Sequence, residues 1–276
     1  MVRRSKSRKR KSPKNWLYIG VGSTLMVGVF AVLGTLFWLT PNKIERNSTT
    51  LCPVNSSIPA ITAIIIDRTD SFGAISKADI EVQIRDILNG AEENELVSLF
   101  VVEPTEKSPL KALIEVCNPG NPQNTDPWTQ NKKLVERNWK TKFHTPLDDL
   151  LNRLLVAESA NVSPIMESIQ SVSITTLGGH DKSNSTRRII LISDLMQHSK
   201  YWSLYTQEAK YSGFQQGENT QGLNPDLRDI SVELFYLQRQ TKRKMDEKNL
   251  LRFWKEWIES YGGRVTRILK ISGMNG

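Results

Sequence analysis

Residues 61–71 read Ile-Thr-Ala-Ile-Ile-Ile-Asp-Arg-Thr-Asp-Ser, an apolar run that ends abruptly in polar side chains. Isoleucine fills four of the first six positions, which is typical of a buried strand. Further apolar runs follow at 96–102, 188–193, 230–237 and 264–271, with helical patterns between most of them. Strands that alternate with helices are typical of a mostly parallel sheet that is covered on both faces. The sequence therefore predicts a doubly wound α/β domain over residues 61–276.

Helices are expected at residues 76–89, 146–157, 163–172 and 246–261. Ser76, with Asp79 three residues on, is expected to cap the first of them. Ser163 is expected to cap the third, with Pro164 at the first helical position. Residues 111–116 alternate between polar and apolar side chains, which predicts a strand with one wet face or an edge position.

An uncharged segment precedes this domain. Residues 16–39 hold no charged side chain and are mostly apolar, with aromatic residues near both ends. A helix of this length, at about 1.5 Å per residue, could cross a hydrocarbon core of about 30 Å. A cleaved signal peptide has a shorter apolar core, and soluble cores rarely use so long an uncharged stretch. We therefore predict a membrane anchor at 16–39 and a linker at 40–60.

Basic residues are concentrated at the N-terminus. Residues 1–15 carry eight Lys or Arg and no acid, while the remaining 29 basic residues equal the 29 acidic ones. The positive-inside rule then places the N-terminus in the cytoplasm and the domain in the periplasm or outside the cell. The tail could contact nucleic acid, but contact with anionic lipid needs no further assumption. A neutral domain argues against nucleic-acid binding.

The chain has two cysteines, Cys52 and Cys117, and both lie on the exported side of the predicted anchor. An oxidising compartment favours a disulfide between them. Two separate buried thiols are the alternative.

Oxygen-bearing side chains follow two of the predicted strands. Asp67, Thr69 and Ser71 alternate after the first strand, and Asp194 follows the strand at 188–193. Ser163 lies between them in the chain, at the start of a predicted helix. In parallel sheets, functional sites lie beyond the carboxyl ends of the strands. Carboxylate and hydroxyl oxygens suit Mg²⁺ or Mn²⁺.

These residues resemble the metal-ion-dependent adhesion site of von Willebrand factor A-type (VWA) domains. That site combines Asp-x-Ser-x-Ser after the first strand, a Thr before a helix and an Asp after a later strand. Thr69 replaces the middle Ser, and Ser163 replaces the Thr, so both departures keep a hydroxyl. The loop after Asp194, residues 195–199, lacks the glycine that many members have there.

The resemblance implies a protein-binding module and no catalytic turnover. The ion would be held mostly by neutral hydroxyls and water, and an acidic side chain of a partner protein would complete its shell. Such binding can move the last helix. An envelope or defence assembly at a bacterial inner membrane is the setting that we expect.

A metal-dependent phosphohydrolase that uses Asp67 as a nucleophile is the alternative from another class. Haloacid dehalogenase-type phosphatases need a second Asp two residues later, and that position is Thr69 here. The three histidines are too scattered for a zinc site.

Aromatic side chains crowd the predicted loop 199–227 beside Asp194. They fit either a partner-binding rim or a cluster packed beneath the loop. The residues concerned are Tyr201, Trp202, Tyr205, Tyr211 and Phe214.

Overall fold

In a computed structural model of the chain, the structure describes residues 13–39, 45–69, 74–103, 109–122, 131–154, 161–178, 184–238 and 246–272. The contacts within the chain divide it between Lys43 and Ile44 into two units.

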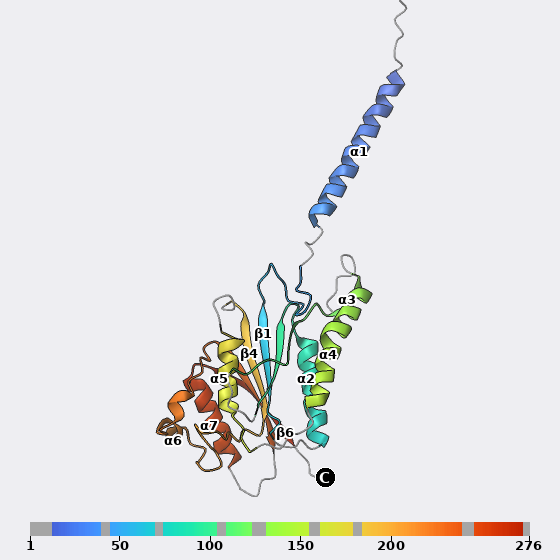
Figure 1. Cartoon of the computed structure of the whole chain (residues 1–276). Coiled ribbons are helices and arrows are strands. Elements are labelled where there is room, and N and C mark those ends of the chain that lie inside the picture. Colours follow the sequence, from blue (N-terminus) through green and yellow to red (C-terminus); the bar gives the residue numbers. More distant parts are fainter. Residues whose placement is uncertain are drawn as a thin grey trace, which may run out of the picture. The chain divides into compact units, whose positions relative to one another are not determined.

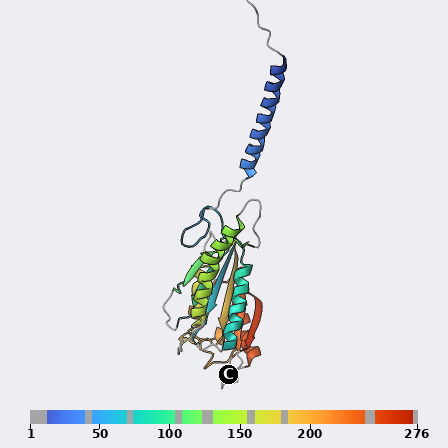
Figure 2. The same cartoon turned by 90° about the vertical axis from the view of Figure 1, so that its right-hand side faces the viewer.

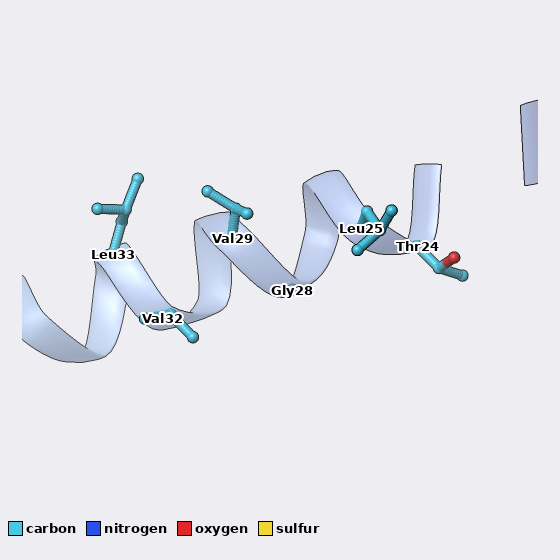
Figure 3. A pocket seen from close by; sticks show the side chains of 6 residues that line it. All are labelled: Thr24, Leu25, Gly28, Val29, Val32 and Leu33. Carbon is cyan, nitrogen blue, oxygen red and sulfur yellow. The ribbon is translucent and has the colours of Figure 1, made fainter. Parts of the chain in front are cut away.

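The described part of the first unit is one helix, α1 (Pro13–Leu39), which covers the whole uncharged segment. Its side chains from residue 21 to residue 35 are exposed. A hollow lies on its surface around Gly28, and Figure 3 shows the residues that line it: Thr24, Leu25, Gly28, Val29, Val32 and Leu33. Among the residues that the structure describes, no helix has both the length and the apolar character to cross a membrane. The helix is confirmed, and its membrane-spanning role stays a prediction.

The second unit is built on one sheet. Within the described residues it has six strands in the order β3-β2-β1-β4-β5-β6 (Figure 1). Neighbouring strands are parallel except at the edge, where β3 runs antiparallel to β2. This confirms the predicted mostly parallel α/β sheet and its alternating edge strand. The strands are β1 (Ala60–Ile66), β2 (Leu96–Val101), β3 (Ile114–Cys117), β4 (Thr186–Ser193), β5 (Ile230–Gln238) and β6 (Arg264–Ser272).

The central strand β1 is buried because both faces of the sheet are covered. Ile61 and Ile65 point into one apolar cluster, whereas Ile64 and Ile66 point into the other. None of these four is more than 1% exposed. The first face packs against α5 (Ile165–Thr175), α6 (Tyr211–Gln215) and α7 (Glu247–Ser260). The second packs against α2 (Ala74–Gly90) and α4 (Thr145–Leu154) (Figure 2).

One predicted helix start needs correction, and one helical segment was not predicted. Helix α2 begins at Ala74, two residues before Ser76, so Ser76 is a buried residue inside the helix rather than its cap. Residues 132–144, to which the sequence analysis assigned no structure, form α3 (Lys132–Trp139) and a π-helical turn, η2 (Lys140–His144), that leads into α4. The Asn131 side chain caps α3 by accepting a hydrogen bond from Leu134 N.

Residues 45–59 belong to the second unit and are tied to the rest of it by side-chain contacts. The Arg46 guanidinium donates to Asn94 Oδ1 at 2.6 Å and to Glu93 Oε1 at 3.0 Å. A disulfide joins Cys52 to Cys117 at the end of β3, as expected. This part of the predicted linker therefore belongs to the domain.

Candidate metal centre

The site forms between β1 and β4, where consecutive strands begin to be added on the opposite side of the sheet. Strands β1 and β4 are parallel neighbours, and the chain continues from β1 toward β2 on one side and from β4 toward β5 on the other. Beyond the end of β1, the Asp67 N–H donates to Ile192 O at 2.9 Å, so Asp67 lies beside the last residues of β4. In open α/β sheets, ligands bind beyond the carboxyl ends of the strands at such a reversal.

The Asp67 carboxylate is fully buried and accepts four hydrogen bonds. Its Oδ1 accepts from the backbone N–H and the hydroxyl of Thr69, at 3.1 and 2.7 Å. Its Oδ2 accepts from Ser163 Oγ at 3.0 Å and from Ser193 Oγ at 2.8 Å. Three segments that are far apart in the sequence therefore converge on one carboxylate, and Thr69 and Ser163 are the two of these partners that the sequence had placed in the site.

Ser193 is a residue of this candidate site that was not predicted from the sequence. It is the last residue of β4, is fully buried, and also accepts the Leu195 N–H at 2.8 Å through its hydroxyl. A hydroxyl side chain at the end of an apolar strand, directly before Asp194, was the available signal.

Ser163 does not cap α5 as expected. The cap position is Pro164, which makes no side-chain cap bond, and the Ser163 hydroxyl points to Asp67 instead. The Gln197 side chain supplies the missing acceptor, because its Oε1 accepts Met166 N–H in the first turn at 2.9 Å. The loop after β4 thus stabilises the start of the helix, and the Ser163 hydroxyl remains part of the site.

Asp194 is only 5% exposed and lies within the electrostatic reach of Asp67. Burial, and then the negative charge of Asp67, raise the pKa of Asp194 to about 7, although a hydrogen bond from Met196 N–H opposes the shift. Leu195 follows with a φ of 62°, a left-handed conformation that glycine adopts at less cost. Such backbone strain concentrates at functional sites because the surrounding structure must maintain it.

The loop after Asp194 is held on two sides. The backbones of Ser163 and His198 exchange two hydrogen bonds of 2.9 Å. On the other side, the buried Trp254 of α7 donates from Nε1 to Leu195 O at 2.9 Å. The loop that carries Asp194 therefore contacts both α5 and α7.

Most aromatic residues of the loop 199–227 pack against the domain and are not exposed to solvent. Trp202 and Phe214 are 7% and 2% exposed, and both contact Phe253 of α7. The interpretation as a packed cluster is correct for them. Tyr205 differs, because it is 44% exposed.

Four of the five predicted ligands lie at this edge of the sheet, and the fifth, Ser71, lies outside the described residues. Across the ranges described, no group of three or more His, Cys, Asp or Glu side chains is arranged to hold a metal. A cation here would depend on hydroxyl oxygens and water as well as on Asp67 and Asp194. The residues fit such an ion, because two carboxylates buried close together are stabilised by positive charge between them. Their hard oxygen donors suit Mg²⁺ or Mn²⁺.

No sequence model of a protein family matches this chain, and no curated protein sequence matches it. Among solved structures, the chain is similar to an aerotolerance-related membrane protein from Bacteroides fragilis NCTC 9343, whose crystal structure carries multiple mutations to serines. The two are 12% identical, and the match covers 77% of this chain and 92% of the other, with a TM-score of 0.36.

Proposed function

We propose that residues 44–276 form a VWA-like protein-interaction module that binds its partner through a divalent cation. The convergence of Thr69, Ser163 and Ser193 on the buried Asp67, beside Asp194, carries this proposal. The cation would be Mg²⁺ or Mn²⁺, and an acidic side chain of the partner would complete its shell.

The charge distribution supports a protein partner. The four hydrogen bonds to Asp67 spread its negative charge over neighbouring hydroxyl and amide groups. Hydroxyl and water ligands add no charge of their own, so the bound ion would retain much of its attraction for a further carboxylate. The neutral balance of the domain argues against nucleic acid.

The burial of Asp67 favours binding over phosphate-ester hydrolysis. A nucleophilic carboxylate must present an oxygen to the phosphorus atom. Asp67 has no exposed surface, and each of its oxygens accepts two hydrogen bonds. We therefore place Asp67 as an anchor for the surrounding loops and as a negative charge that attracts the cation through its hydroxyl neighbours, and we propose that the protein is not an enzyme.

Substitution of Asp67 tests the site. We expect Asp67→Asn to lower the affinity for Mn²⁺ by at least about tenfold, because it removes the charge while keeping the side-chain shape. Isothermal titration of the purified full-length chain with Mn²⁺ measures this. Asp226→Asn is the matched control, since Asp226 is an exposed carboxylate paired with Arg228.

Two outcomes count against the proposal. If the wild-type chain gives no heat of binding at millimolar Mn²⁺, the domain keeps its fold but does not bind a partner through a cation. Mn²⁺-dependent release of phosphate from p-nitrophenyl phosphate that Asp67→Asn abolishes would favour the hydrolase.

We further propose that α1 anchors the domain in a bacterial inner membrane, with the N-terminus in the cytoplasm and residues 44–276 in the periplasm. The uncharged segment 16–39 and the basic residues before it support this orientation. The disulfide between Cys52 and Cys117 supports an oxidising compartment for the domain.

Alkaline carbonate extraction of membranes tests the anchor. We expect the full-length chain to stay in the membrane pellet, because a helix inserted in the bilayer resists extraction whereas a charge-held surface protein does not. A variant with Leu25→Lys and Val29→Lys is expected to move to the supernatant. Release of the unchanged chain would contradict the anchor.

A further inference from the structure

One exposed aromatic side chain lies at the rim of the site. His198 follows Asp194 by four residues, and its backbone pairs with that of Ser163, whose hydroxyl binds Asp67. The Tyr205 ring packs edge-on against the His198 ring, with 5.3 Å between the ring centroids. This chain of contacts links Tyr205 to the residues around Asp67, and the charges of Asp194 and Asp67 act on its phenol, while nearly half of its surface stays open to solvent.

Ser203 holds the two rings in place. Its hydroxyl lies 2.8 Å from His198 Nδ1 and accepts the Tyr205 N–H at 3.3 Å. The backbone of His198 also bridges to that of Ser203. Ser203 therefore holds the backbone of Tyr205 and the ring of His198, and the His198 ring contacts the ring of Tyr205.

The phenol of Tyr205 is protonated at neutral pH, as in an ordinary tyrosine, and its surroundings favour that form further. Partial burial raises its pKa, and the negative charges of Asp194 and Asp67 raise it further. A protonated phenol is a hydrogen-bond donor, and carboxylate oxygens accept strong hydrogen bonds from such donors. A partner carboxylate bound to a metal through one oxygen has a second oxygen that can accept a hydrogen bond.

We propose that Tyr205 donates a hydrogen bond to the second oxygen of the partner carboxylate, and that His198 is the residue that positions Tyr205. This inference rests on the proposed function and specifies it further. The partner group is a carboxylate in contact with the cation and the phenol together, so the site selects carboxylates over ligands that offer the metal a single oxygen.

Acetate is the probe that tests this inference. Acetate replaces water on bound Mn²⁺ and thereby lowers the relaxation rate of the water protons. Titration of the Mn²⁺-loaded full-length chain with acetate therefore reports carboxylate affinity without knowledge of the partner. We expect Tyr205→Phe to lower acetate affinity by about tenfold, because a hydrogen bond to a charged group is lost. Mn²⁺ affinity is expected to stay unchanged.

The control variants come from the same loop. Tyr201→Phe removes a phenol hydroxyl from a ring that lies under Lys200 Nζ and beside Gly222, and it is expected to leave acetate affinity unchanged. His198→Ala is expected to weaken acetate binding, whereas His198→Phe, which keeps a ring against Tyr205, restores it. Recovery by the ring alone is the signature of a positioning role.

The outcomes separate this inference from the function on which it rests. If the wild-type chain does not bind Mn²⁺, the cation-dependent function is overturned and this inference falls with it. If Mn²⁺ binds but Tyr205→Phe and wild type bind acetate equally, only the role of Tyr205 is overturned.

Discussion

Replacing Arg188 by methionine is expected to lower the free energy of unfolding by about 3 kcal/mol, because it leaves the buried Glu95 carboxylate without its cation and leaves Glu233 paired with Arg267 alone. The Arg188 guanidinium donates to Thr62 Oγ1 at 3.0 and 3.1 Å and pairs with Glu95 and Glu233. The side chains of these glutamates are only 5% and 12% exposed. The network crosses β1, β4 and β5, and it therefore stabilises the strands whose ends carry the site.

Urea denaturation of the two proteins measures this cost, and a surface pair supplies the control. Arg85 pairs with Asp148 between α2 and α4, but its own side chain is 43% exposed. Arg85→Met is expected to cost about 1 kcal/mol or less. A triple variant with Glu95→Gln, Arg188→Met and Glu233→Gln is expected to recover part of the loss, because no buried charge is left unpaired. Equal costs for Arg188→Met and Arg85→Met would contradict a buried network.

Asp194→Asn is expected to stabilise the metal-free domain by up to about 4 kcal/mol at about pH 8. The pKa of Asp194 in the folded state is about 7, above its ordinary value of 3.8. The folded state therefore holds the proton more tightly than the unfolded state does. The penalty for ionising the buried carboxyl is absent below about pH 4, grows as the pH rises, and is complete above about pH 7. Because asparagine never ionises, the variant avoids this penalty.

Divalent cations are expected to remove the stability advantage of Asp194→Asn over the wild type. An ion between Asp67 and Asp194 favours their charged forms, so millimolar Mg²⁺ should raise the melting temperature of the wild type at about pH 8 but not at about pH 5. The variant is expected to respond to Mg²⁺ at neither pH.

Thermal melts of both proteins, with and without Mg²⁺, measure this effect. Asp226→Asn is the control, because the pKa of Asp226 is shifted in the opposite direction. The hydrogen bond from Arg228 lowers the pKa of Asp226 to about 2. That variant is therefore expected to gain no stability at the higher pH. If Asp194→Asn is no more stable than the wild type at about pH 8 without Mg²⁺, ionisation of Asp194 carries no penalty.

Much of the architecture was predictable because its signals are local. Five of the six described strands follow from apolar runs, β3 follows from an alternation of polar and apolar residues, and α7 follows from an apolar stripe between Asp246 and the glycine pair at 262–263. The start of α2 was misplaced because a serine followed by an acidic residue also occurs inside helices. Helix α3 was missed because its few apolar side chains do not form a buried face.

The arrangement of the site was predictable only in outline. The rule that parallel strands end at one edge placed Asp67 and Asp194 together, and the VWA resemblance added Ser163. Neither could indicate that Gln197 would stabilise the start of α5 while the Ser163 hydroxyl turned to Asp67. Both hydrogen bonds join segments that are more than thirty residues apart in the sequence.

The sequence by itself determined the strands, their mostly parallel arrangement and the oxygen-rich character of one sheet edge, because side-chain periodicity and strand-end position are local properties. The tertiary structure alone decided the burial of Trp202 and Phe214 and the exposure of Tyr205. It also raised the pKa of Asp194, because burial and the nearness of a second carboxylate exist only after the chain has folded.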